Sequence, residues 1–182
     1  MARLAVELGH DDAVALARCG HTLAHLVGDV DSGVRLVDGA LSLNLNLALA
    51  WWSSGWLRAF RGQSDAAIER FAHARLSPLD PELFRMRAGT GFAHLLAGRF
   101  NEASSWAEKA AGDLPNYLSA VSVMAAANAL AGRTAEARRA MLHVRQLDPL
   151  LRLSNLQNLY PIRRPEDFAV WSDGLRKAGL PE

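Results

Sequence analysis

The 182-residue sequence predicts an all-α protein, an α-α superhelix of about four stacked helix pairs with C-terminal capping helices. Three observations predict this fold. Glycines recur at a nearly constant spacing, and small and large apolar residues recur at fixed distances from them. No stretch alternates apolar and polar residues as a β-strand does. One helix pair cannot bury its own apolar face, so we expect the core to form between stacked pairs.

The spacing of four glycines defines the repeat. Gly28 and Gly62 are 34 residues apart, and so are Gly98 and Gly132, whereas Gly62 and Gly98 are 36 apart. The two extra residues fall in "SPLDPE", residues 77–82, where two prolines predict a lengthened turn. Each glycine should end the first helix of its pair with a positive φ.

Small side chains follow the same period. A small residue stands seven positions before three of the glycines and five positions after all four, which lets the two helices of a pair approach closely. The first set is Gly55, Gly91 and Ala125, with His21 as the exception in the first unit, and the second set is Gly33, Ala67, Ala103 and Ala137.

The helices follow from this frame. First helices are expected near residues 12–27, 47–61, 82–97 and 117–131, and second helices near 31–43, 65–76, 101–112 and 135–147. Ser64 and Thr134 are suited to cap two of the second helices. The four units then lie near 12–45, 46–80, 81–115 and 116–149, within a repeat region of residues 1–149.

Residues 150–182 should form capping helices that cover the last repeat. A short helix after Pro149 should stop at Tyr160-Pro161, and a second should begin at Pro165, because proline suits the first helical position. Its apolar stripe is Phe168, Trp171 and Leu175, and Gly179 should end it.

The order small, small, large, small, proline at this period resembles the tetratricopeptide repeat (TPR) over residues 12–149, although Leu45 replaces the closing proline of the first unit. The wider sequence, above all the ending "RRPEDFAVWSDGLRKAGLPE", resembles the C-terminal TPR region of alphaproteobacterial proteins with an N-terminal class III adenylate/guanylate cyclase domain. Related regions also follow winged-helix DNA-binding domains. The cyclase resemblance implies a bacterial signal-transduction protein in which any cyclase activity lies in a separate N-terminal domain.

Composition narrows the function classes. A net charge of +1 argues against a nucleic-acid-binding protein. The single cysteine, Cys19, rules out an internal disulfide. No run of about 18 apolar residues predicts a membrane span. Glu7, Asp11 and Asp12 interrupt the apolar N-terminal region, which does not fit a signal peptide, so a cytoplasmic location is expected.

Two histidines and an aspartate suggest a metal site only superficially. His21, His25 and Asp29 are spaced four residues apart, but Asp29 follows the turn glycine, where the helix should already have ended. A packing or surface role for the histidines is favoured. We therefore expect no metal, no cofactor and no catalytic residue.

The first helices should line a concave groove that carries aromatic and basic residues. Trp52 and Trp56 lie one turn apart, Phe92 matches Trp56 in the next repeat, and Arg18 and Arg85 border them. Tryptophan and arginine are typical of interface hot spots. The rings could equally pack internally, against neighbouring repeats or the C-terminal helix, and the sequence leaves both readings open.

The function predicted from this pattern is a non-catalytic protein–protein interaction or scaffold module. Its partner would be a protein or peptide, and an attached cyclase domain is one candidate. One alternative is a regulatory sensor whose groove binds a small ligand or the attached catalytic domain, and another is a free-standing scaffold.

Overall fold

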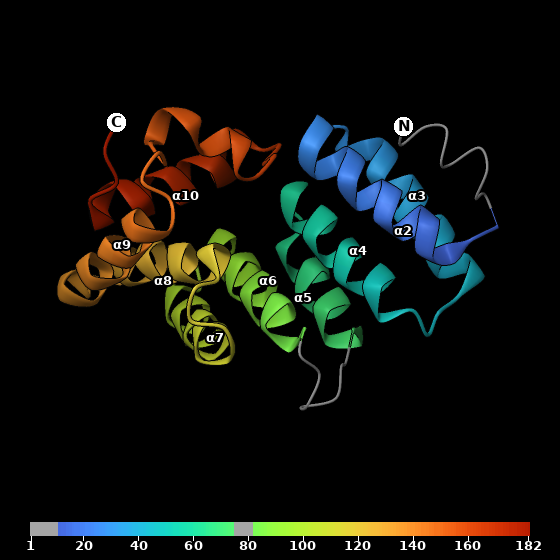
Figure 1. The fold of residues 1–182 in the computed structure, drawn as a ribbon, viewed down its shortest axis with the longest axis horizontal. Helices are drawn as coiled ribbons and strands as arrows, with labels where there is room; N and C mark the ends of the chain where they lie inside the picture. The colour runs from blue at the N-terminus through green and yellow to red at the C-terminus, as the bar shows by residue number, and fades with distance from the viewer. Residues whose placement is uncertain (1–10, 75–81) are drawn as a thin grey trace.

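The computed structural model describes residues 11–74 and 82–182, which form helices and connecting turns with no strand among them (Figure 1). Successive helices pair antiparallel and the pairs stack into an α-α superhelix, which confirms the predicted fold class. No helix within these residues is long and apolar enough to cross a membrane.

Four helix pairs follow one another along the described residues. The first joins α2 (Ala13–Thr22), which continues as the π-helix η1 (Leu23–Val27), to α3 (Val30–Leu43). The others pair α4 (Ala48–Phe60) with α5 (Ser64–His73), α6 (Leu83–Leu96) with α7 (Phe100–Asp113), and α8 (Leu118–Leu130) with α9 (Thr134–Leu147). These bounds lie close to the predicted ones. The last predicted residues of the 65–76 helix, and residues 77–81 of the lengthened turn, lie outside the described residues.

The glycine frame has the expected geometry. Gly28, Gly62, Gly98 and Gly132 have φ angles of 76°, 74°, 74° and 78°, the left-handed conformation that ends a helix without a side-chain clash. Gly91 lies at a close contact between α6 and α7, because a Cβ there would be 3.1 Å from the Ala103 carbonyl oxygen.

The predicted helix caps are wrong by one residue. Ser64 and Thr134 are the first residues of α5 and α9, and neither helix has a side-chain cap. Asp29 is a cap that the prediction missed: its carboxylate accepts a hydrogen bond from the Ser32 backbone N–H at 3.1 Å, at the start of α3.

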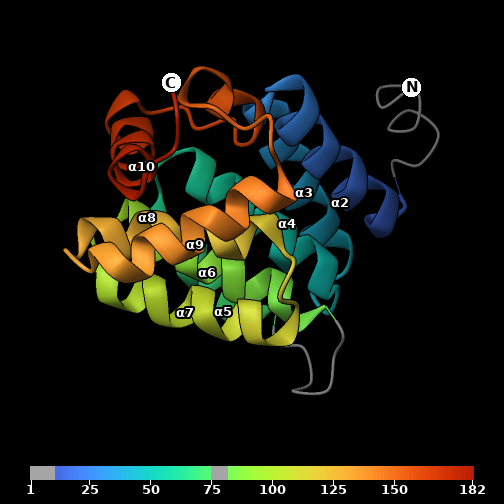
Figure 2. The ribbon, with the colours of Figure 1, turned by 60° about the vertical axis from the view of Figure 1, so that its left-hand side comes forward.

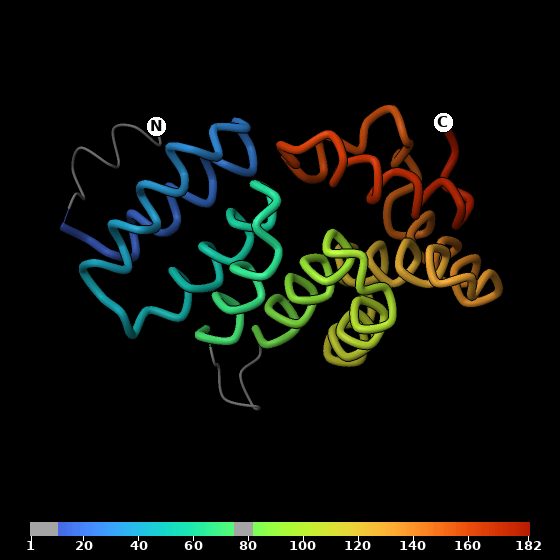
Figure 3. The backbone as a smooth tube through the Cα atoms, turned by 180° about the vertical axis from the view of Figure 1, so that it is seen from behind, coloured from blue at the N-terminus to red at the C-terminus, as the bar shows by residue number. Residues whose placement is uncertain are grey.

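The C-terminal segment, residues 150–182, folds back over the concave side of the repeats. It contains the 3₁₀-helix η2 (Leu153–Asn158) and α10 (Pro165–Ala178), and α10 packs on α8, α6 and α9 (Figure 2). The chain between η2 and α10 reaches the first two pairs (Figure 3), where the Arg163 backbone N–H donates to the Phe60 carbonyl oxygen at 2.8 Å. This segment therefore spans the superhelix and covers more than its last repeat.

Candidate functional site

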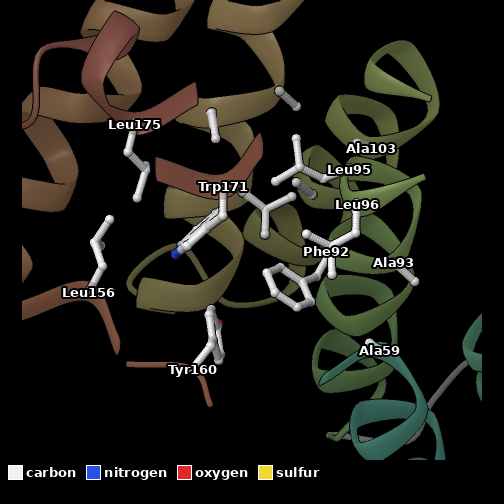
Figure 4. Close-up of a cluster of buried hydrophobic side chains, with 14 of the residues drawn as sticks. Ala59, Phe92, Ala93, Leu95, Leu96, Ala103, Leu156, Tyr160, Trp171 and Leu175 are labelled. Carbon is white, nitrogen blue, oxygen red and sulfur yellow. The ribbon is translucent and has the colours of Figure 1, made fainter. Parts of the chain in front are cut away.

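Two of the predicted groove aromatics lie in the core. Trp56 is 3% exposed and Phe92 is fully buried. The Tyr160 ring covers both, with ring centroids 5.3 Å from Trp56 and 4.7 Å from Phe92. Figure 4 shows Phe92, Tyr160 and Trp171 gathered between α6 and α10. The expected strip of accessible rings is therefore corrected for Trp56 and Phe92, because the C-terminal segment occupies that part of the concave face.

The other three predicted residues, Arg18, Trp52 and Arg85, line a cavity of about 740 Å³. It lies between the C-terminal half of α2 and the N-terminal parts of α4 and α6, and we call it the α2–α4–α6 cavity. The remaining lining residues come from the same three helices and the residue before α6: His21, Thr22, Ala48, Leu49, Ser53, Glu82 and Met86. The repeat frame brings the five predicted residues to one face but divides them between the cavity and the core.

Stacked rings close one side of the cavity. The His21 ring centroid lies 4.4 Å from that of the Trp52 indole, and the His21 ring also stacks on His25 with centroids 5.7 Å apart. His25 in turn meets the edge of Tyr160 at 6.2 Å. The row of rings from Trp52 to Tyr160 therefore separates the cavity from the filled part of the concave face.

The charged groups of the cavity do not cancel. Arg85 forms an ion pair with Glu82. Arg18 is exposed, and in residues 11–74 and 82–182 no ion pair to it is found. Two guanidinium groups against one carboxylate leave one net positive charge, and that charge belongs to Arg18.

His21 adds no charge near neutral pH. Burial, together with the nearby charges of His25 and Arg85, lowers the pKa of its imidazole to about 4. The neutral ring can donate one hydrogen bond and accept another. Its Nδ1 atom and the Trp52 Nε1 atom are both buried without a hydrogen-bond partner among the described residues.

The three residues of the proposed metal pattern have different surroundings. His21 and His25 stack on each other, and the Asp29 carboxylate caps α3 by accepting a hydrogen bond from the Ser32 backbone N–H. Within the described ranges, no group of three or more His, Cys, Asp and Glu residues is arranged to hold a metal ion.

Sequence reasoning did not assign the other seven lining residues to the site. Among them, His21 was given a packing or surface role, and Leu49, Met86 and Glu82 were not singled out. The irregular first unit was the available signal for His21, since a histidine stood where the frame required a small residue.

The sequence matches no family model and no curated protein. Solved structures share its fold. PilW, a widely conserved type IV pilus biogenesis factor, aligns with a TM-score of 0.73 at 16% identity, over 97% of this chain and 78% of PilW. PilF of Pseudomonas aeruginosa aligns at 0.68 and 19% identity, over 86% of this chain and 70% of PilF.

A third neighbour, YrrB, is described as a TPR protein with an unusual peptide-binding site. It aligns with a TM-score of 0.58 at 19% identity, over 98% of this chain and 90% of YrrB. These identities establish a shared fold only. The chain therefore has the superhelical fold of TPR proteins.

Proposed function

We propose that this chain is a non-catalytic protein-interaction module that binds a segment of a partner protein at the α2–α4–α6 cavity. One observation carries the proposal. The chain's own C-terminal segment fills part of the concave face, whereas the cavity lined by Arg18, Trp52 and Arg85 stays open. A half-buried tryptophan beside two arginines has the composition of an interface hot spot.

Selected peptides test this proposal. A displayed peptide library is enriched on the purified chain, and the dissociation constants of the enriched peptides are measured for wild type and Trp52→Ala. Loss of a true anchor costs at least about 2 kcal/mol, or roughly thirtyfold in affinity. Trp106→Ala is the matched control, because this half-buried tryptophan lies on α7, away from the cavity, against Lys109.

Equal binding by wild type and Trp52→Ala would refute the cavity as the partner site. Melting temperatures of both variants are measured in parallel, so that a loss of binding is read only from folded protein.

A second part of the proposal concerns the kind of protein to which this module belongs. We propose a cytoplasmic, bacterial signalling protein in which this segment serves a class III cyclase domain. The support is the sequence resemblance, which is strongest in "RRPEDFAVWSDGLRKAGLPE". In that stretch Trp171 and Leu175 are fully buried, so the residues that carry the resemblance also hold the C-terminal segment in place.

A cyclase assay tests this context. The chain alone, incubated with ATP or GTP and manganese, should form no cyclic nucleotide, whereas a class III cyclase domain encoded upstream in the same gene or operon should bind it. Cyclic nucleotide formed above a heat-killed control, or an upstream cyclase domain that does not bind, would contradict this part of the proposal. A free-standing scaffold would have no such domain.

A further inference from the structure

The shape of the α2–α4–α6 cavity favours a compact occupant over a long one. An extended segment running along the concave face would have to pass the Trp52, His21 and His25 rings, and Tyr160 packs directly behind them. A volume of about 740 Å³ lies within the range of small-molecule sites, about 300–1,000 Å³. The occupant should therefore end within the cavity.

The charge of the cavity favours a single anionic group. Of the two arginines that line the cavity, Arg85 is paired with Glu82, and Arg18 has no ion pair to any described residue. A planar guanidinium binds a carboxylate through two parallel hydrogen bonds. An occupant with two negative charges would place the second one near Glu82.

The rest of the lining favours an apolar body. The Trp52 indole offers an aromatic face, and Leu49 and Met86 add aliphatic surface from α4 and α6. Met86 is nearly buried, so its side chain forms part of the wall. Apolar walls with a small number of placed polar groups are typical of small-molecule sites.

We propose that the α2–α4–α6 cavity binds a small organic monocarboxylate, with its carboxylate on Arg18 and its apolar body against Trp52, Leu49 and Met86. The chain would then act as a sensor of such acids. This inference uses the cavity of the proposed function, but it requires no partner protein and can be tested without one.

Three free acids serve as probes: phenylacetate, 4-phenylbutanoate and octanoate. Each is titrated into the full chain beside its neutral amide, by calorimetry and by following the Trp52 indole N–H resonance, which is assigned from its absence in Trp52→Phe. At least one acid should bind saturably and at least about tenfold more tightly than its amide, because a hydrogen bond to a charged group is stronger than a neutral one.

Arg18→Gln keeps a polar side chain at an exposed position and should fold, which its melting temperature checks. It should abolish the preference for acid over amide. Arg138→Gln, at an exposed arginine of α9, is the matched control and should retain the preference.

The proposal is overturned if no acid binds saturably, if acids and amides bind equally, or if Arg18→Gln behaves as wild type. A selected peptide that binds while the acids do not would overturn this inference and leave the proposed function standing. Acids that bind while no peptide does would support this inference and overturn the proposed function.

Discussion

At the residue scale, Trp52 and Trp56 differ in role although one helical turn separates them. Trp56 is 3% exposed beneath Tyr160, whereas Trp52 lines the cavity and contacts His21. The repeat period predicts that both tryptophans lie on the first-helix face. It cannot predict which one is covered, because the covering ring comes from a segment outside the repeats. Sequence therefore identified the face but not the boundary between core and cavity.

Alanine substitutions should separate the two tryptophans. Trp56→Ala leaves a cavity among Phe92, Tyr160 and Phe60 and should lower the free energy of unfolding by about 3–5 kcal/mol. Trp52→Ala should cost clearly less, since its ring borders space that is already open. Urea denaturation measures both variants. Equal losses would mean that Trp52 also belongs to the core.

The His21 imidazole should make stability depend on pH. Its folded-state pKa of about 4 lies below the ordinary histidine value of 6.5, so the unfolded chain binds more protons between these two values. Stability should be full above pH 6.5 and should fall as the pH drops toward 4, where His21 would contribute a loss of up to about 3 kcal/mol. His25 stacks on His21 and Arg85 acts on it, and both oppose its protonation.

Denaturation midpoints measured from pH 7 to pH 4 test this dependence. His21→Gln should flatten the curve, although His25, whose pKa burial also lowers, should leave a residual slope. His143→Gln, at a half-exposed histidine on α9, is the matched control for the loss of a histidine outside the cavity. An equally steep curve for His21→Gln would contradict the assignment.

At the scale of elements, the first helix pair shows where the repeat frame failed. A π-helix holds one more residue than the equivalent stretch of α-helix. Because η1 occupies Leu23–Val27, the small residue of the first unit stands eight positions before Gly28 and is Gly20, whereas the regular frame points to His21. A Cβ at Gly20 would be 2.7 Å from the Gly33 carbonyl oxygen. The extra residue turns His21 toward the cavity.

The other helices could be predicted because their signals are local. Turn glycines, small residues at fixed spacing and the proline at the start of α10 each act within one or two turns of helix. The π-helix has no comparable signature in the residues that form it. The one signal was His21, which stands where the repeat frame expects a small residue. Gly20, one position earlier, is the small residue that a shift by one position would have identified.

Substitution of Gly20 tests the shifted register. A Cβ there meets backbone and the Val37 side chain, so Gly20→Ala should force the α2–α3 pair apart and destabilise the chain by about 1–3 kcal/mol. Gly112→Ala is the matched control, since that helical glycine has no atom within 4 Å of a Cβ and alanine favours helix. If thermal or urea unfolding finds the two variants equally stable, the close contact at Gly20 is absent.

At the scale of the whole molecule, the C-terminal segment links both ends of the superhelix. It packs through α10 on α8 and α6, and it reaches the turns of the first two pairs through Arg163 and Arg164. Sequence predicted its helix and the buried stripe of Trp171 and Leu175. It did not predict that the segment crosses the concave face, because that path depends on contacts with Gly28, Phe60 and Gly62, which no local pattern encodes.

Two turn glycines offer a direct test of this link. Gly62 and Gly98 both have a φ of 74°, so alanine at either position carries the same left-handed strain, about 1–2 kcal/mol. Their surroundings differ. A Cβ at Gly98 meets nothing within 4 Å, whereas at Gly62 it would be 2.1 Å from Arg164 Cδ and 2.5 Å from Asp167 Oδ2. The difference between the two variants therefore reports contact with the C-terminal segment alone.

Gly62→Ala should displace Arg164 and Asp167 and lose about 1–3 kcal/mol more than Gly98→Ala. Asp167 is 6% exposed in the first turn of α10, so its carboxylate has little free space to move into. The segment should loosen from the second pair before the repeats unfold. Trypsin should then cut after Arg163 faster in Gly62→Ala than in Gly98→Ala, as mass spectrometry of the fragments would show; the bond after Arg164 is blocked by Pro165. Equal stability and equal cleavage would mean that the segment is not held at Gly62. The packing of α10 on α8, α6 and α9 would then be what holds the C-terminal segment on the repeats.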